Sequence, residues 1–144
     1  MSDWLVSANL LSVLLHKNNI QHFTLDEVLK GWNVPPQLIN NIELSLVKVD
    51  TMREELGFPI VLTSVYRPDW YNKLVGGVKG SLHTYFNAID SMPESGSVKQ
   101  LKMMHDWIYE NRDSGMGIGY YQTFLHIDYR CILGRKSATW GKKL

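Results

Sequence analysis

The 144-residue chain has a single cysteine and almost no net charge. One cysteine excludes an internal disulfide framework and a cysteine-rich zinc site, and it fits a reducing compartment without proving one. Fifteen basic residues against fourteen acidic ones give a net charge of +1, which supplies no general attraction to nucleic acid or to an anionic membrane. We therefore expect neither nucleic acid nor a membrane as a partner.

Long apolar runs and targeting signals are also lacking. The apolar run near the N-terminus covers about a dozen residues, fewer than the ~20 that a membrane span needs. It lacks the basic region and the small-residue cleavage site of a signal peptide. We expect a monomer made in the cytoplasm without a signal peptide. If its target is a cell wall, a phage-encoded protein of this kind would reach it by lysis or in a virion.

The length and the ordinary composition, 44% hydrophobic and 20% charged, predict one globular domain. Residues 1–57 are expected to be helical, because leucines recur at near-helical spacing and Thr24 with Glu27 forms a capping-box pattern. A long helix is predicted from Pro36 to its stop at Gly57. Residues 58–131 would hold the sheet and the site, and residues 132–144 a solvated basic tail that Trp140 docks.

Four short segments read as strands: "IVLTSV", "NAIDSM", "MGIGYY" and "FLHIDYR". A helix that Ser97 can cap lies between the second and third of them. Helices followed by strands with one intervening helix predict an α+β fold, with a small, mainly antiparallel sheet and helices packed on it.

Three polar residues in the strand region are candidates for a metal site. In "FLHIDYR" alternation puts Phe124, His126 and Asp128 on one face of the strand. His83 and Asp90 could converge with His126 if the two strands are neighbours. Two imidazoles and one carboxylate suit a catalytic zinc, which keeps a fourth position open. The alternative is that each is a hydrogen-bonded structural residue.

The stretches "VLTSVYRPDWYNKLVGGVKGSLHTYFNAID" and "GIGYYQTFLHIDYR" resemble the zinc D-Ala-D-Ala carboxypeptidase family, in particular its small, often phage-borne members. The resemblance runs from about Phe23 to Arg130. A TSGYR-like segment, a VGG loop, an SxHxxGxAxD motif and a late HxD recur there in the family's order. It implies a hedgehog/DD-peptidase-like fold, one Zn²⁺ held by His83, Asp90 and His126, and hydrolysis of peptidoglycan stem peptides at a D-amino-acid bond.

The resemblance also implies roles for residues beside the metal. Arg67 matches an arginine that stabilises the oxyanion in related dipeptidases, although it could instead form a surface ion pair. Ser81 matches a serine that could bind substrate or cap the turn before His83. From the residues alone, Tyr120 and Tyr121 could donate hydrogen bonds to the substrate or serve only in packing.

The sequence departs from the family pattern at three positions. Phe86 and Val65 replace glycines, which puts the local backbone and the pocket width in question. Thr123 stands where dipeptidase relatives carry the glutamate that activates water. Asp128 is then the candidate base, because parity puts it on the face of His126. The alternative is that its carboxylate orients a ligand histidine.

Two other functions stay open at this point. A phage or virion protein could keep the zinc site for binding or structure without hydrolysis, and a zinc hydrolase could act on another small peptide or amide. Cys131 is expected to be buried and inert on the opposite face of the strand. The histidines at positions 16, 22 and 105 are expected to be surface or structural residues.

Overall fold

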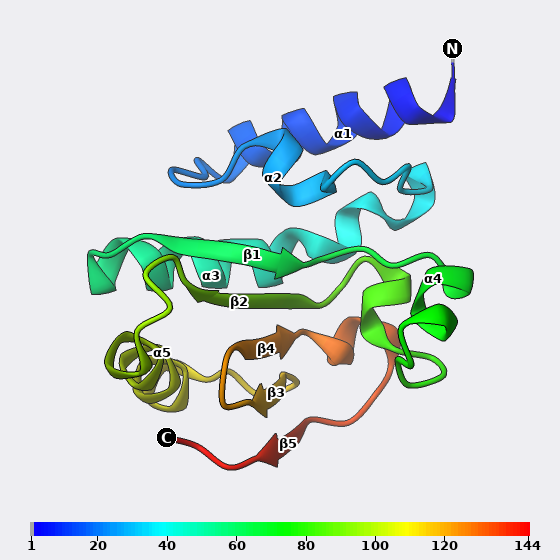
Figure 1. Ribbon diagram of the computed structural model, residues 1–144. Coiled ribbons are helices and arrows are strands. Elements are labelled where there is room, and N and C mark those ends of the chain that lie inside the picture. Colours follow the sequence, from blue (N-terminus) through cyan, green and yellow to red (C-terminus); the bar gives the residue numbers. More distant parts are fainter. Residues whose placement is uncertain (1) are drawn as a thin grey trace.

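The computed structural model describes residues 2–144 (Figure 1). Its elements, in chain order, are α1 (Asp3–Lys17), α2 (Leu25–Leu29), the 3₁₀ helix η1 (Pro36–Ile42), α3 (Glu43–Leu56), β1 (Ile60–Ser64), α4 (Asp69–Leu74), the 3₁₀ helix η2 (Leu82–Tyr85), β2 (Ile89–Pro93), α5 (Val98–Asn111), β3 (Gly117–Tyr120), β4 (Leu125–Asp128), the 3₁₀ helix η3 (Arg130–Leu133) and β5 (Ala138–Gly141). Among these residues no helix has the length and apolar character needed to cross a bilayer.

The strands form one sheet in the order β1-β2-β4-β3-β5. All neighbouring strands are antiparallel except β3 and β5, which are parallel. Figure 1 shows α1 and α2 stacked beyond β1, α3 behind the sheet, and α5 at the end of the sheet where β1 starts. This arrangement confirms the predicted α+β fold with a mainly antiparallel sheet.

The helical third of the chain forms largely as its sequence patterns predict. The Thr24–Glu27 capping box is present at the start of α2, and Gly57 ends α3 with a φ of 78°. The long helix predicted from Pro36 is divided, however, because its first seven residues are a 3₁₀ helix. The pair Asn40–Asn41 lies in that part, and asparagine is a weak helix former.

The core lies between one face of the sheet and the helices. Ile89, Ile127 and Ile118 occupy directly paired positions on β2, β4 and β3 and are almost fully buried. α5 contacts both β2 and β4, and it also packs against α3. This apolar face is filled by side chains from all these elements, so polar groups on the same strands must point to the other face.

The opposite face carries a row of residues in register across all five strands. Ser64 on β1 pairs with Asp90 on β2, Asp90 with His126 on β4, His126 with Gly119 on β3, and Gly119 with Trp140 on β5. Gly119 makes room for the indole ring, because a Cβ built there would lie 2.6 Å from Trp140 Nε1. The ring can therefore reach across β3 to the imidazole of His126, with 5.1 Å between their centroids.

The outer edge of β1 is covered by side chains. Lys30 Nζ donates to the carbonyl of Leu62 at 3.0 Å, and Arg53 Nη1 donates to the carbonyl of Ile60 at 3.0 Å. These two carbonyls belong to the strand that has no neighbour on this side. The edge is thereby closed to an additional strand at two successive outward-facing positions.

Three features differ from the sequence expectations. The tail is not simply solvated, because residues 138–141 pair with β3 as β5. Residues 69–74 form the short helix α4, which was not foreseen. Cys131 is exposed rather than buried, because β4 ends at Asp128 and η3 follows. Strand alternation therefore does not extend to this cysteine.

Substitution of Gly119 by alanine should destabilise the fold, because the new methyl group would displace the Trp140 ring. We expect a loss of roughly 1–3 kcal/mol in the free energy of unfolding, measured by urea denaturation. Thr139→Ala is the matched control, since Thr139 is an exposed residue of β5, the edge strand that carries Trp140. A Gly119→Ala protein as stable as the wild type would contradict the packing of the indole on β3.

Candidate metal centre

Three elements bring His83, Asp90 and His126 together. His83 lies in η2, whose start is capped by Ser81 through a hydrogen bond from His83 N to Ser81 Oγ at 3.2 Å. Asp90 and His126 are directly paired on β2 and β4. All three side chains are buried, and one potential ligand atom from each lies within 4.8 Å of the others. The predicted convergence of these residues is therefore present.

The nitrogen and oxygen atoms of the cluster are spaced as metal ligands are. His83 Nε2 lies 3.2 Å from Asp90 Oδ2, and His126 Nδ1 lies 2.8 Å from Asp90 Oδ1. The two imidazole rings meet edge to face, with 5.2 Å between their centroids. Ligands of a tetrahedral zinc, each about 2.0–2.2 Å from the ion, lie a little over 3 Å apart, so the donor set fits such an ion.

His83 carries the strongest sign of a missing ligand. Its Nδ1 lies 2.8 Å from the carbonyl oxygen of Val65, which makes Nδ1 the protonated nitrogen and leaves the lone pair on Nε2. Asp90 Oδ2 lies 3.2 Å from Nε2, but it is an acceptor as well, so within residues 2–144 the buried Nε2 has no hydrogen-bond donor. An unsatisfied buried lone pair is costly, and a cation held between His83 and Asp90 would satisfy it.

Asp128 is held by a dense set of donors behind His126. Its Oδ1 accepts from the backbone N–H groups of Gly117 and Arg130 and from Arg130 Nε. Its Oδ2 accepts from Arg130 Nη2 and lies 2.8 Å from His126 Nε2. The side chain is fully buried. This arrangement fits the alternative role of Asp128, which is to orient His126 so that Nδ1 faces the metal position.

The protonation states follow from these contacts. Burial alone would raise the pKa of Asp90 and of Asp128, but hydrogen bonds from His126 and their other partners outweigh it and hold both pKa values well below the ordinary range. Burial alone would lower the pKa of His126, yet its hydrogen bonds to Asp128 and Asp90 raise it. In the metal-free protein His126 therefore keeps a proton that a cation at Nδ1 would replace.

The cluster lies in a cleft of about 450 Å³. The cleft is lined by four cationic side chains, which are Arg67, Lys79, Arg130 and Arg135. Arg67 is directed to the cluster: its Nη2 lies 3.5 Å from Asp90 Oδ2, and its Nε donates to Ser64 Oγ at 3.1 Å. Since the whole chain has a net charge of only +1, positive charge is concentrated at this cleft.

The other predicted contact residues divide between cleft and core. Ser81 and Tyr121 line the cleft, and the Tyr121 hydroxyl accepts a hydrogen bond from Trp140 Nε1 at 2.9 Å. Tyr120 does not line it, because its side chain is buried and packs edge-on against His105. Tyr120 therefore fits the packing alternative. Thr123 does not line the cleft either.

A comparison with protein families agrees with this geometry. A family model described as peptidase M15 matches residues 21–128, which include every member of the cluster. The chain belongs to the peptidase M15 family. This confirms the resemblance seen in the motifs and identifies a member of a family of zinc-dependent metallopeptidases. A comparison with curated proteins found no match.

Phe86, which replaces the glycine of the family motif, has a backbone conformation that glycine favours. Phe86 ends η2 with φ 54° and ψ 47°, the left-handed conformation that glycine favours. Its ring is fully buried and meets Tyr66 edge to face at 6.3 Å. Burial of the ring offsets the cost of the conformation, which is about 1–2 kcal/mol. The turn at the end of η2 thus forms here with phenylalanine in place of the motif's glycine.

Sequence reasoning missed Arg130 and Trp140 as parts of the site. Trp140 Nε1 binds Tyr121, and its ring lies 5.0 Å from the Arg130 guanidinium. One signal was available in "GIGYY". Its two glycines, Gly117 and Gly119, pair with Asp128 and His126, on the face of the sheet that carries the metal site. A Cβ at Gly117 would lie within 2.5 Å of Arg130 and Asp128 atoms. Alternate glycines in a strand can mark close approach of other groups.

Loss of His126 should abolish zinc retention by the M15 protein. Wild type and His16→Ala, an exposed-helix control, should retain one zinc per chain after dialysis, and His126→Ala none, as measured by atomic absorption. Chelation should lower the thermal midpoint of the wild type and of His16→Ala but not that of His126→Ala, because a ligand at a thousand times its Kd stabilises by about 4 kcal/mol. Stoichiometric zinc in His126→Ala would remove this residue from the site.

Zinc affinity should continue to rise with pH above 6.5, the ordinary His pKa. The metal must displace the His126 proton, and the pKa of His126 is raised, so affinity should increase by about tenfold per pH unit until that pKa is passed. Competition with a chromophoric chelator, corrected for its own protonation, measures this. In Asp128→Asn the zinc affinity should reach its plateau at a lower pH, because the carboxylate that helps to raise the pKa of His126 is lost. A wild-type affinity that is flat above pH 6.5 would contradict the proposed proton displacement.

Proposed function

We propose that this M15 protein hydrolyses peptidoglycan stem peptides at a bond next to a D-amino acid, with one zinc ion held by His83, Asp90 and His126. The observation that carries the proposal is the buried, unpaired Nε2 of His83, which faces Asp90 and His126 at the base of an open cleft. A bound zinc would lower the pKa of a water to near neutrality and polarise the scissile carbonyl.

Arg67 is the residue we assign to the carbonyl oxygen of the substrate. Its guanidinium is fixed from three sides, by Ser64 Oγ, by Asn72 Oδ1 and by Asp90 Oδ2. A fixed cation beside the reacting carbonyl stabilises the negative charge that develops on its oxygen without having to reorganise. Once a metal ion draws on the charge of Asp90, the Nη2 group of Arg67 can donate to the substrate.

Neutral donors and cations complete the proposed substrate site. The hydroxyls of Ser81 and Tyr121 each accept a hydrogen bond from the protein, which leaves their own protons free to be donated to a peptide. Among residues 2–144, the carboxylates that line the cleft are Asp90 and Asp128, and both are paired. A cationic cleft of this kind favours peptides that carry carboxylates, as stem peptides do.

We assign Asp128 to the orientation of His126 rather than to proton transfer. The five donors around its two oxygens leave no position for a water to approach. The proton lost by the attacking water would then pass, through water in the open cleft, to the amine nitrogen that leaves as the C–N bond breaks. This lack of a free base also favours a second candidate, a phage or virion protein that binds stem peptides at the same site without cutting them.

Mass spectrometry of stem peptides separates the two functions. The zinc-loaded protein should release a terminal alanine or open a cross-link, and the chelated protein should not. Arg67→Ala should keep its zinc and lose about 100-fold or more in kcat/KM, whereas Arg112→Ala, outside the cleft, should keep full activity. Intact peptides from a folded, zinc-bound protein over a range of pH would contradict hydrolysis and favour the binding function.

A further inference from the structure

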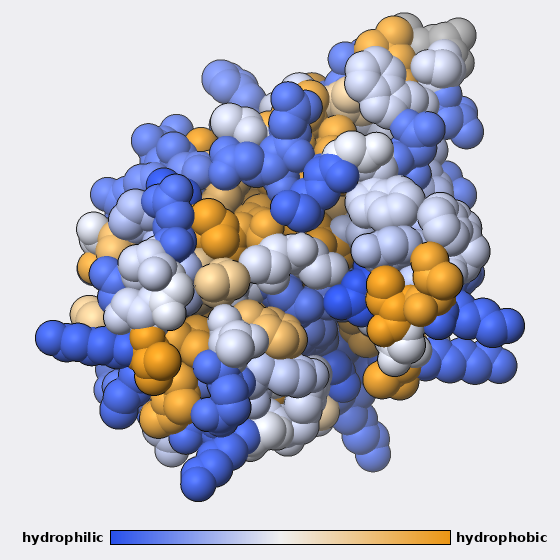
Figure 2. Space-filling model, in the orientation of Figure 1, coloured by the Kyte–Doolittle hydropathy of each residue, from blue (hydrophilic) through white to orange (hydrophobic). Residues whose placement is uncertain are grey.

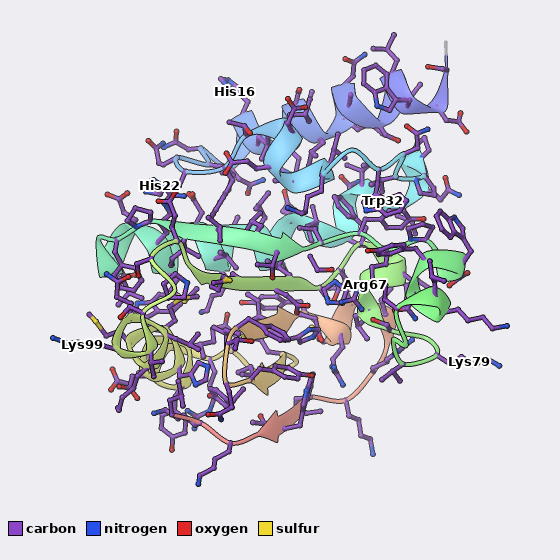
Figure 3. The ribbon with its side chains drawn as sticks, viewed as in Figure 1. His16, His22, Trp32, Arg67, Lys79 and Lys99 are labelled. Atoms are coloured by element: carbon purple, nitrogen blue, oxygen red, sulfur yellow. The ribbon has the colours of Figure 1, made fainter. Side chains whose placement is uncertain are left out.

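A second cavity lies directly beside the metal cleft. Its volume is also about 450 Å³, within the range of small-molecule sites. Arg67 lines both cavities, so they share this side chain as part of their walls. Figure 3 shows Trp32, which lines the second cavity, and Arg67 on the same side of the molecule, next to α4. A substrate bound at the metal centre could therefore continue into the second cavity.

Aromatic rings form one wall of this cavity. Trp32 and Tyr71 line it with 5.0 Å between their ring centroids. Trp70 packs edge-on against both of them at 5.8 Å and is 64% exposed. Figure 2 shows apolar surface gathered on this side of the molecule, and Val75, which also lines the cavity, is half exposed. Exposed aromatic and apolar groups around a cavity indicate a binding surface.

Another part of the lining is polar and is connected to the metal centre. It is formed by Thr63 and Ser64, at the point where the register of β1 against β2 shifts. Thr63 Oγ1 donates to the carbonyl of Asp90 at 3.2 Å, and Ser64 Oγ accepts from Arg67 Nε. Irregular strand pairing of this type often serves to aim side chains next to an active site. Lys30 adds a cationic rim.

We propose that this second cavity binds a sugar ring of the glycan strand that carries the stem peptide. A pyranose ring presents C–H groups on its faces, which pack on aromatic rings, and hydroxyls around its edge, which need hydrogen-bond partners. Trp32 and Tyr71 supply the aromatic surface, and Thr63, Ser64 and Lys30 the polar one. The choice of glycan as the occupant rests on the proposed function, in which the adjacent cleft holds the peptide.

Binding of a peptide-free glycan tests this site independently of hydrolysis. The probe is the tetramer of N-acetylglucosamine, titrated into the full-length protein and followed by the indole N–H resonances in NMR spectra. We expect the Trp32 resonance to shift, and Tyr71→Ala to weaken the affinity by about tenfold. Tyr71→Leu, which keeps apolar bulk, should weaken it similarly. Tyr109→Ala, an exposed tyrosine on α5, is the matched control and should bind as the wild type does.

Kinetics provide a second measurement. Tyr71→Ala should raise KM about tenfold for stem peptides that still carry their disaccharide and leave KM for bare peptides unchanged. The proposal is overturned if the wild type does not bind the tetramer or if Tyr71→Ala binds it equally well. It is also overturned if the Trp32 shift follows protein concentration instead of glycan, which would mark a protein–protein surface. Glycan binding without peptide cleavage would contradict the proposed peptidase activity and leave the sugar site standing.

Discussion

The structure depends on charge pairing within a buried polar row. Placing two imidazoles and two carboxylates on one face of a small sheet is costly unless each group has a partner. Asp90 is met by His126 and Arg67, and His126 is met by Asp90 and Asp128. Positive and negative groups therefore alternate through the row. The exception is Nε2 of His83, and the gap lies where a cation completes the set.

This row constrains strands that contribute no ligand. On the face of the site, β3 has to carry glycine at positions 117 and 119. Asp128 and Arg130 occupy the space above Gly117, and the indole ring of Trp140 occupies the space above Gly119. β5 then supplies the indole that covers the imidazole of His126. The parallel edge strand is thus part of the wall of the site. Pairing of β5 with β3 holds Trp140 over the imidazole of His126, and the contact between the two rings in turn stabilises this pairing.

Features that depend on interactions between residues close in sequence could be predicted, and features that depend on contacts between distant residues could not. Helix caps, strand alternation and the cluster of His83, Asp90 and His126 could be predicted, because local patterns and a family motif carry them. The role of Asp128 stayed open, since it depends on which donors surround the carboxylate. These are the Arg130 side chain and the backbone N–H of Gly117 on another strand. β5 was missed because it is only four residues long, begins with alanine and ends with glycine, which have weak strand propensity, and lies between basic residues of the tail. Its pairing with β3 is a contact between distant parts of the chain.

The covered edge of β1 has a consequence for the stereochemistry of recognition. Many peptide-binding domains hold their ligands as an added strand, which suits L-peptides, whose side chains alternate between two faces. A D-residue breaks that alternation, so a strand-addition site would discriminate against it. Here the carbonyls of Ile60 and Leu62 are already occupied by Arg53 and Lys30. A ligand is therefore not held as an added strand on β1, and this edge imposes no handedness through a backbone ladder.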